Sequence, residues 1–225
     1  MFFVEKRLNI ITGHYGSGKT NLAVNMALEL SNKGKKAAVI DLDIVNPYFR
    51  TADFRTLFEQ NRIQLAAPVY AGSNLDIPAL PPEIGTLLSD ETTTVIMDVG
   101  GDDTGAIALG RYAELIRDMS YDMFYVVNQY RFGTKVPEDS VDLLKAIETA
   151  SRLQASFIVN NSNLGMGTTA EDVLDSVSFA DEICRQTGLP LAATTIWEKK
   201  AAEVKLPMKY PVKIFVTKPW EKFPY

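Results

Sequence analysis

The segment that most constrains the fold of this chain is a glycine-rich loop at residues 13–20. It satisfies the pattern G-x-x-x-x-G-K-S/T, follows an apolar run at residues 8–12 and precedes a helical pattern at Lys19–Asn32. Glycines let successive backbone N–H groups face one anion, and the N-terminus of the next helix adds partial positive charge. This context predicts a phosphate-binding loop and leaves little weight for a chance glycine-rich turn.

The same loop predicts how a nucleoside triphosphate and its metal ion would be held. Lys19 supplies a positive charge for the β- and γ-phosphates, and the Thr20 hydroxyl is the expected direct Mg²⁺ ligand. We assign to the nucleotide-binding set the whole loop and the residue after it, namely Gly13, His14, Tyr15, Gly16, Ser17, Gly18, Lys19, Thr20 and Asn21.

Short β-rich apolar runs alternate with longer amphipathic stretches, which predicts βαβ units around a mainly parallel sheet. The expected strands are residues 8–12, 36–42, 93–99, 123–128, 156–160 and 191–196, with 212–216 as a possible edge strand. The expected helices are residues 19–32, 83–89, 105–119, 138–152 and 170–187, and Gly34 and Gly188 are placed to end two of them. We therefore expect an α/β fold of the three-layer P-loop type, formed by one domain over residues 1–225.

Composition excludes several other classes of protein. The formal net charge of -5 argues against a general polyanion binder, so we do not expect nucleic acid as a partner. With Cys184 as the one cysteine, the chain can form neither an internal disulfide nor a CxxC metal site, and we expect a cytoplasmic protein. No apolar run is long enough to span a membrane, and the prolines within residues 218–225 argue against a C-terminal membrane helix, so we expect no stable membrane anchor.

Two carboxylates close the second predicted strand. Alternation places Asp41 and Asp43 on the same side, at the strand end where open α/β sheets bind ligands. Either could contact the Mg²⁺ shell or position an attacking water. The alternative is that Asp43, Asn46 and Pro47 only form a turn; downstream of a phosphate loop we favour the functional interpretation.

The strand at residues 93–99 also ends in a carboxylate, followed by paired glycines. Asp98 takes the position of a Walker B carboxylate, which holds Mg²⁺ directly or through water. Gly100 and Gly101 would allow the backbone to approach a γ-phosphate closely. For Asp102 and Asp103 we prefer a role at the start of the next helix.

A later strand runs into a group of amides at residues 160–163. The Asn160 amide could pair with a purine edge because it carries both a donor and an acceptor, although asparagine is equally common in plain turns.

Together these features resemble the MinD/ParA-like branch of P-loop proteins, the CobQ/CobB/MinD/ParA nucleotide-binding domains. The resemblance covers most of the chain and rests on the loop, on Asp41-Leu42-Asp43, on Asp98-Val99-Gly100-Gly101 and on Asn160. It implies ATP with Mg²⁺ as the ligand, Asp43 in switch I, Asp98 at the start of switch II and Asn160 on adenine. Thr20, Asp43 and Asp98 are then the metal-site residues.

The chain departs from this branch at one loop position. ATPase members usually carry a lysine after the first glycine, which reaches the partner's phosphates across a dimer; this chain has His14. A neutral imidazole substitutes poorly for a permanent cation, so the resemblance leaves a homodimer open without implying that mechanism. The missing CxxC and C-terminal amphipathic helix distinguish the chain from the cluster carriers and from the membrane-cycling regulators.

We therefore expect a slow Mg-ATPase that couples its ATP or ADP state to an unidentified protein client. Lys19 and Asp43 are the expected catalytic residues, because one holds the phosphates and the other orients water. The sequence does not rank the candidates for a further stabilising cation, which are Arg50, Arg55, Arg111 and Arg131.

Two alternatives stay open at this point. The first is a small-molecule kinase or ATP-dependent ligase similar to dethiobiotin synthetase, in which residues 44–55, with Tyr48, Phe49 and Arg50, would cradle an organic acceptor. The second is a nucleotide-dependent scaffold with little hydrolysis.

Overall fold

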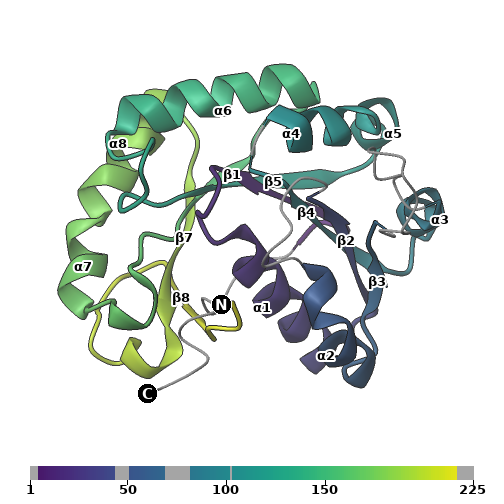
Figure 1. Cartoon of the computed structure of the whole chain (residues 1–225), viewed down its shortest axis with the longest axis horizontal. Coiled ribbons are helices and arrows are strands. Elements are labelled where there is room, and N and C mark those ends of the chain that lie inside the picture. The colour runs from purple at the N-terminus through teal and green to yellow at the C-terminus, as the bar shows by residue number, and fades with distance from the viewer. Residues whose placement is uncertain (1–4, 44–50, 69–81, 102, 217–225) are drawn as a thin grey trace, which may run out of the picture.

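The computed structural model describes residues 5–43, 51–68, 82–101 and 103–216, and within them eight parallel strands form one sheet (Figure 1). The strand order is β3-β2-β4-β1-β5-β6-β7-β8. The strands are β1 Leu8–Gly13, β2 Ala37–Leu42, β3 Gln64–Ala66, β4 Thr94–Val99, β5 Tyr121–Val127, β6 Phe157–Asn160, β7 Leu191–Trp197 and β8 Lys209–Val212. The prediction of an α/β fold with a mainly parallel sheet is confirmed.

Helices cover both faces of the sheet, as Figure 1 shows, so the central strands are buried on both sides. One face packs against α1 (Lys19–Asn32) and α2 (Arg55–Gln60). The other packs against α3 (Glu83–Ser89), α4 (Asp103–Gly110), α5 (Ala113–Arg117), α6 (Pro137–Ser151) and α8 (Val177–Thr187). The remaining helix α7 is Ala170–Asp175, and short 3₁₀ turns are η1 Thr51–Phe54, η2 Gly165–Gly167 and η3 Glu198–Lys200.

Two predicted helices are each divided in the structure. The pattern at residues 105–119 forms α4, which ends at Gly110, and α5. At Gly110 the chain lies so close to α6 that a Cβ would be 2.7 Å from the Ala150 carbonyl oxygen. The pattern at residues 170–187 forms α7 and α8, separated at the buried Ser176. The Ser176 hydroxyl donates to the Val173 carbonyl oxygen at 2.7 Å and so closes the end of α7.

Other local expectations have mixed outcomes. Gly34 and Gly188 follow α1 and α8 with φ of 72° and 74°, so both adopt the left-handed conformation predicted for helix ends. The edge strand is β8 at Lys209–Val212 rather than residues 212–216, and β3 and α2 were not predicted. Asp103 begins α4 as expected. Asp102, residues 44–50 with Tyr48, Phe49 and Arg50, and residues 218–225 lie outside the described residues.

The topology brings the ligand-binding ends of the strands together. β1 lies between β4 and β5, and the chain leaves it through the glycine-rich loop into α1. The pairing register sets Ile11 beside Asp98 and Asp41 beside Asp98, so the loop and both carboxylate-bearing strands end at one edge. No helix among the described residues is long and apolar enough to cross a membrane.

Candidate functional site

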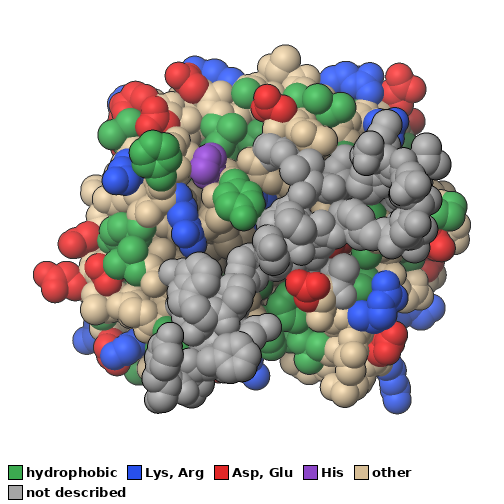
Figure 2. Space-filling model, in the orientation of Figure 1, with side chains coloured by type: hydrophobic (Ala, Val, Ile, Leu, Met, Phe, Trp, Pro, Cys, Tyr) green, Lys and Arg blue, Asp and Glu red, His purple; other side chains and the backbone are tan. Residues whose placement is uncertain are grey.

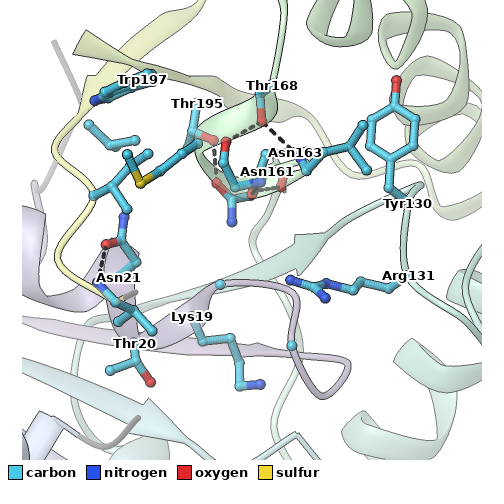
Figure 3. A pocket seen from close by; sticks show the side chains of 18 of the residues that line it. Lys19, Thr20, Asn21, Tyr130, Arg131, Asn161, Asn163, Thr168, Thr195 and Trp197 are labelled. Atoms are coloured by element: carbon cyan, nitrogen blue, oxygen red, sulfur yellow. Dashed lines mark hydrogen bonds between the residues drawn. The ribbon is translucent and has the colours of Figure 1, made fainter. Parts of the chain in front are cut away.

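A cavity of about 420 Å³ opens at the carboxyl ends of β1, β6 and β7. Its floor is the glycine-rich loop with the start of α1, and its walls come from the segments after β5, β6 and β8 (Figure 3). This volume is typical of a pocket for a small organic ligand or cofactor.

The backbone of the glycine-rich loop takes conformations that require glycine. Gly13 has φ of 145°, and a Cβ at this position would collide with the Val126 carbonyl oxygen of β5. Gly18, with φ of 93°, is the N-cap of α1, so the loop leads directly into the helix N-terminus. Lys19 is buried, and its Nζ donates to the His14 carbonyl oxygen at 3.0 Å, so the lysine spans the loop from below.

Thr20 and Asp98 meet at the start of α1. The Thr20 hydroxyl donates to Asp98 Oδ2 at 2.8 Å, and Asp98 Oδ1 is buried without a hydrogen-bond partner among the described residues. Burial and the neighbouring Asp41 carboxylate together raise the pKa of Asp98 to about 8, although Lys19 and the hydrogen bond from Thr20 act in the opposite direction. The positive charge of Lys19 is therefore not enough to balance the buried carboxyl groups of Asp98 and Asp41.

This charge imbalance fits a divalent cation. A hydroxyl and a carboxylate with an unpartnered oxygen are the oxygen ligands that Mg²⁺ prefers. Asp43, which lines the cavity, and the buried Asp41, whose Oδ1 accepts from the Asp43 backbone N–H at 2.9 Å, stand nearby. The structure thus brings together all three residues that the sequence assigned to the metal, namely Thr20, Asp43 and Asp98.

Gly101 approaches the glycine-rich loop rather than open space. A Cβ at Gly101 would lie 2.5 Å from the Tyr15 backbone nitrogen and 2.8 Å from Lys19 Nζ. The segment after β4 is therefore packed directly on the loop, where it can respond to whatever the loop binds.

Of three further predicted binding residues, His14 and Asn160 do not line the cavity, whereas Asn21 does. The His14 Nδ1–H donates to the Tyr15 carbonyl oxygen at 2.8 Å, and His14 is not among the residues that line the cavity. Asn21 lines it, but its Oδ1 accepts from the Phe215 backbone N–H at 2.8 Å and so fixes the wall after β8. Asn160 is fully buried, and its Nδ2 donates to the Ser176 hydroxyl at 2.9 Å, outside the cavity lining.

The next amide along the chain, Asn161, lies in the cavity wall. Its Nδ2 donates to the Ser17 carbonyl oxygen at 2.5 Å, and its Oδ1 accepts from the Thr195 hydroxyl. Asn161 therefore ties the glycine-rich loop to β6 and β7, and Figure 3 shows Asn161 beside Thr195. The run of amides at residues 160–163 was the available sequence signal, but sequence alone did not select its second member.

One of the candidate arginines also lines the cavity. Arg131, from the turn after β5, extends toward the loop opposite Lys19 (Figure 3). Arg55 and Arg111 are exposed and do not line the cavity, and Arg50 lies outside the described residues.

Much of the cavity lining is apolar, and Trp197 lies on the side opposite Lys19 (Figure 3). This lining combines hydrophobic side chains with a few polar groups, a combination typical of pockets for heterocyclic ligands. These apolar residues are Leu164, Met166, Val173, Ile196, Trp197, Val212, Ile214 and Val216.

Comparisons with known proteins agree with this arrangement. The family model described as the CobQ/CobB/MinD/ParA nucleotide binding domain matches residues 9–194. The cytosolic Fe-S cluster assembly factor CFD1 of Yarrowia lipolytica is 23% identical over 192 residues, which are 84% of this chain and 60% of that protein. The cytosolic Fe-S cluster assembly factor Nubp2 homolog of Anopheles gambiae is 21% identical over 192 residues, 84% of this chain and 66% of that protein. The chain thus spans less than two thirds of the length of these relatives.

A solved structure gives the same fold. The cell division protein FtsY from Thermotoga maritima has a TM-score of 0.60 and 16% identity, over 88% of this chain and 65% of that chain. The family match extends from β1 into β7 and includes the glycine-rich loop, whereas the cavity residues from Thr195 to Val216 lie beyond it. The chain therefore belongs to the CobQ/CobB/MinD/ParA nucleotide-binding domain family.

Proposed function

We propose that this chain binds Mg-ATP, hydrolyses it slowly, and couples its nucleotide state to the binding of a protein client. One observation carries the proposal: a single cavity joins the phosphate loop, with Lys19 and Thr20, to an apolar lining that suits a base. A triphosphate on the loop would place its nucleoside toward that apolar lining.

The phosphate end would act by positioning and electrostatics. Backbone N–H groups of the loop and Lys19 hold the phosphates, and the N-terminus of α1 adds partial positive charge. Thr20 and Asp98 would hold Mg²⁺, with Asp43 in its surroundings, and the ion would neutralise charge on the β- and γ-phosphates. Asp43 faces the cavity, where its carboxylate would orient the attacking water.

The base end supports a purine through stacking surface and a few polar groups. Trp197 and Met166 offer broad apolar contact, and Asn163 adds an amide to the cavity lining. Asn160 is fully buried and does not line the cavity, so we assign the base contacts to the segment after it rather than to Asn160 itself. Competition between ATP and GTP, measured by calorimetry, tests the preference for adenine.

Exposed apolar side chains beside the cavity support a protein client. Tyr15, 56% exposed, and Met166, 53% exposed, line the cavity mouth, and Phe132, 89% exposed, follows Arg131. Figure 2 shows hydrophobic side chains on both sides of the chain's single histidine on this face. Such clustered apolar surface marks interaction sites, and its position at the loop would make binding sensitive to the nucleotide. A second copy of the chain is another occupant that this face could receive.

The two relatives are named as Fe-S cluster assembly factors, but the cysteine content of this chain does not favour that role. Cys184 is the only cysteine of the chain, and burial raises the pKa of its thiol to about 11. A protonated, half-buried thiol is a poor metal ligand.

Analysis of the reaction products tests the proposed function. With labelled Mg-ATP we expect free phosphate as the labelled product and a turnover that Asp43→Ala lowers by about a hundredfold, since a positioned water-orienting group contributes roughly 10²- to 10⁴-fold. Label on an organic product from a metabolite mixture would instead establish a kinase or ligase. Binding without turnover above the Asp43→Ala background would establish a scaffold.

Gly101→Ala should weaken ATP binding by displacing the loop. The new methyl group would lie 2.5 Å from the Tyr15 backbone nitrogen, so either the glycine-rich loop or the segment after β4 must shift. We expect the Kd for ATP to rise about tenfold or more, the equivalent of ~1.4 kcal/mol. Gly85→Ala on α3 is the matched control, because a Cβ there meets nothing within 4 Å. Equal calorimetric affinities for the two variants would contradict the packing argument.

A further inference from the structure

Arg131 is carried by a turn that the structure braces from several sides. The Asn128 side-chain oxygen accepts from the Tyr130 backbone N–H at 3.0 Å, and the Arg131 backbone N–H donates to the Asn128 carbonyl oxygen at 3.2 Å. The Tyr130 hydroxyl donates to the Asp172 carbonyl oxygen at 2.6 Å, and Gly133 turns the chain with φ of 88°. The turn is therefore held in one conformation that directs Arg131 inward.

The Arg131 guanidinium lies over the glycine-rich loop at Gly16. A Cβ built on Gly16 would be 3.4 Å from Arg131 Nε and 3.6 Å from Cζ. The Nε atom is buried and has no hydrogen-bond partner among the described residues. Within the same residues the guanidinium forms no salt bridge with a carboxylate. A buried donor left without a partner is costly, which indicates that a bound group supplies the acceptor.

His14, the other candidate for a cation beside the loop, does not line the cavity. The His14 ring is occupied with the Tyr15 carbonyl oxygen, and its Nε2 lies toward Gly133, 3.3 Å from where a Cβ on that glycine would stand. Arg131 and Lys19 instead approach the cavity from opposite sides of the loop, as Figure 3 shows. The glycine-rich loop, whose backbone would hold phosphates, lies between these two cations.

We infer that Arg131 binds the phosphate chain of the nucleotide and supplies, from within the same chain, the second cation of the site. The planar guanidinium presents donors in a fixed fork that matches phosphate oxygens, whereas an imidazole in the position of His14 offers no permanent charge. The inference rests on the proposed function, because it requires a phosphate-bearing ligand in this cavity. It assigns to one protomer a charge that needs no partner subunit.

The test compares ATP and inorganic triphosphate as ligands of the whole chain. Arg131→Ala should raise the Kd of both by the same factor, about tenfold to a hundredfold, because hydrogen bonds to charged groups are worth roughly 1.5–3 kcal/mol. Arg131→Lys should recover part of the loss, since it keeps the charge without the fork. Lys135→Ala is the matched control: it removes one positive charge from an exposed position on the same loop.

Each outcome is decisive. Equal affinities of Arg131→Ala and wild type for inorganic triphosphate would overturn the inference. The proposed function would stand in that case, provided that Lys19→Ala loses ATP binding. A loss for ATP alone would place Arg131 on the nucleoside and also overturn it. A wild-type chain that binds neither ligand would remove both proposals. The thermal midpoint of the nucleotide-free Arg131→Ala variant should match wild type, which separates a binding role from a folding role.

Discussion

Lys19→Ala is expected to abolish measurable ATP binding and leave the fold intact. Lys19 Nζ lies inside the glycine-rich loop and donates to the His14 carbonyl oxygen, so it is placed to contact phosphates that the loop holds. Losing charge-assisted bonds to two phosphates, each worth roughly 1.5–3 kcal/mol, should raise the Kd at least about a hundredfold. Alanine favours the first turn of a helix as well as lysine does, so α1 should form unchanged.

Calorimetric titration with Mg-ATP measures this effect, and thermal unfolding of the ligand-free proteins checks the fold. Lys35→Ala is the matched control. Lys35 is exposed just after α1, so this substitution removes the same charge at a position away from the cavity. Undiminished ATP affinity in Lys19→Ala would contradict the assignment of the glycine-rich loop as the ATP-binding site. A Lys35→Ala variant that lost affinity equally would show that net charge, not the loop, governs binding.

Most strands of the sheet could be predicted from the sequence, because each strand is marked by a pattern of neighbouring residues. A buried parallel strand is an apolar run, so β1, β2, β4, β5, β6 and β7 were visible in the sequence. The division of the helices was not visible. At Gly110, where α4 ends, the chain packs closely on Ala150 of α6, and a contact between residues so far apart in the chain leaves no local pattern. The short β3 strand carries too few residues to show a period.

The site likewise contains residues that sequence motifs predict and residues that only the folded structure identifies. Lys19, Thr20, Asp43 and Asp98 follow from motifs at strand ends, and the structure gathers them at one cavity edge or in contact with it. The choice of Asn161 over Asn160 depends on which side chain the strand end turns toward Ser17, and adjacent residues of a strand face opposite ways. Arg131 was one of four unranked arginines until the turn after β5 was placed against the loop.

The metal site shows a conflict between stability and binding. Asp98 is buried beside Asp41, with one oxygen that no described residue satisfies, and the positive charge of Lys19 only partly offsets this. An arrangement that destabilises the ligand-free protein is retained where a cation bound with the ligand would relieve it. A neutral replacement should therefore improve folding and damage function.

Asp98→Asn is the substitution that exposes this conflict. The raised pKa of Asp98 means that this carboxyl, ionised in the unfolded chain, must take up a proton on folding at neutral pH, which costs stability. The amide keeps an acceptor for the Thr20 hydroxyl and cannot ionise, so the ligand-free protein should gain about 1–3 kcal/mol in free energy of unfolding. Its thermal midpoint should rise by roughly 2 °C or more. The same variant should lose the gain in ATP affinity that Mg²⁺ gives the wild type, and its turnover should fall about a hundredfold or more, because metal charge stabilisation is worth several kcal/mol.

Two measurements on one variant check both halves of this prediction. Thermal unfolding without ligand gives the stability change, and ATP titrations with Mg²⁺ or with a chelator give the metal dependence. Asp118→Asn is the control, because it removes one carboxylate from an exposed position after α5. An Asp98→Asn protein that is less stable than wild type would contradict the charge argument, since the carboxylate would then be satisfied without a cation. A variant that keeps the full effect of Mg²⁺ on affinity would remove Asp98 from the metal site and leave Thr20 and Asp43 as its remaining candidates.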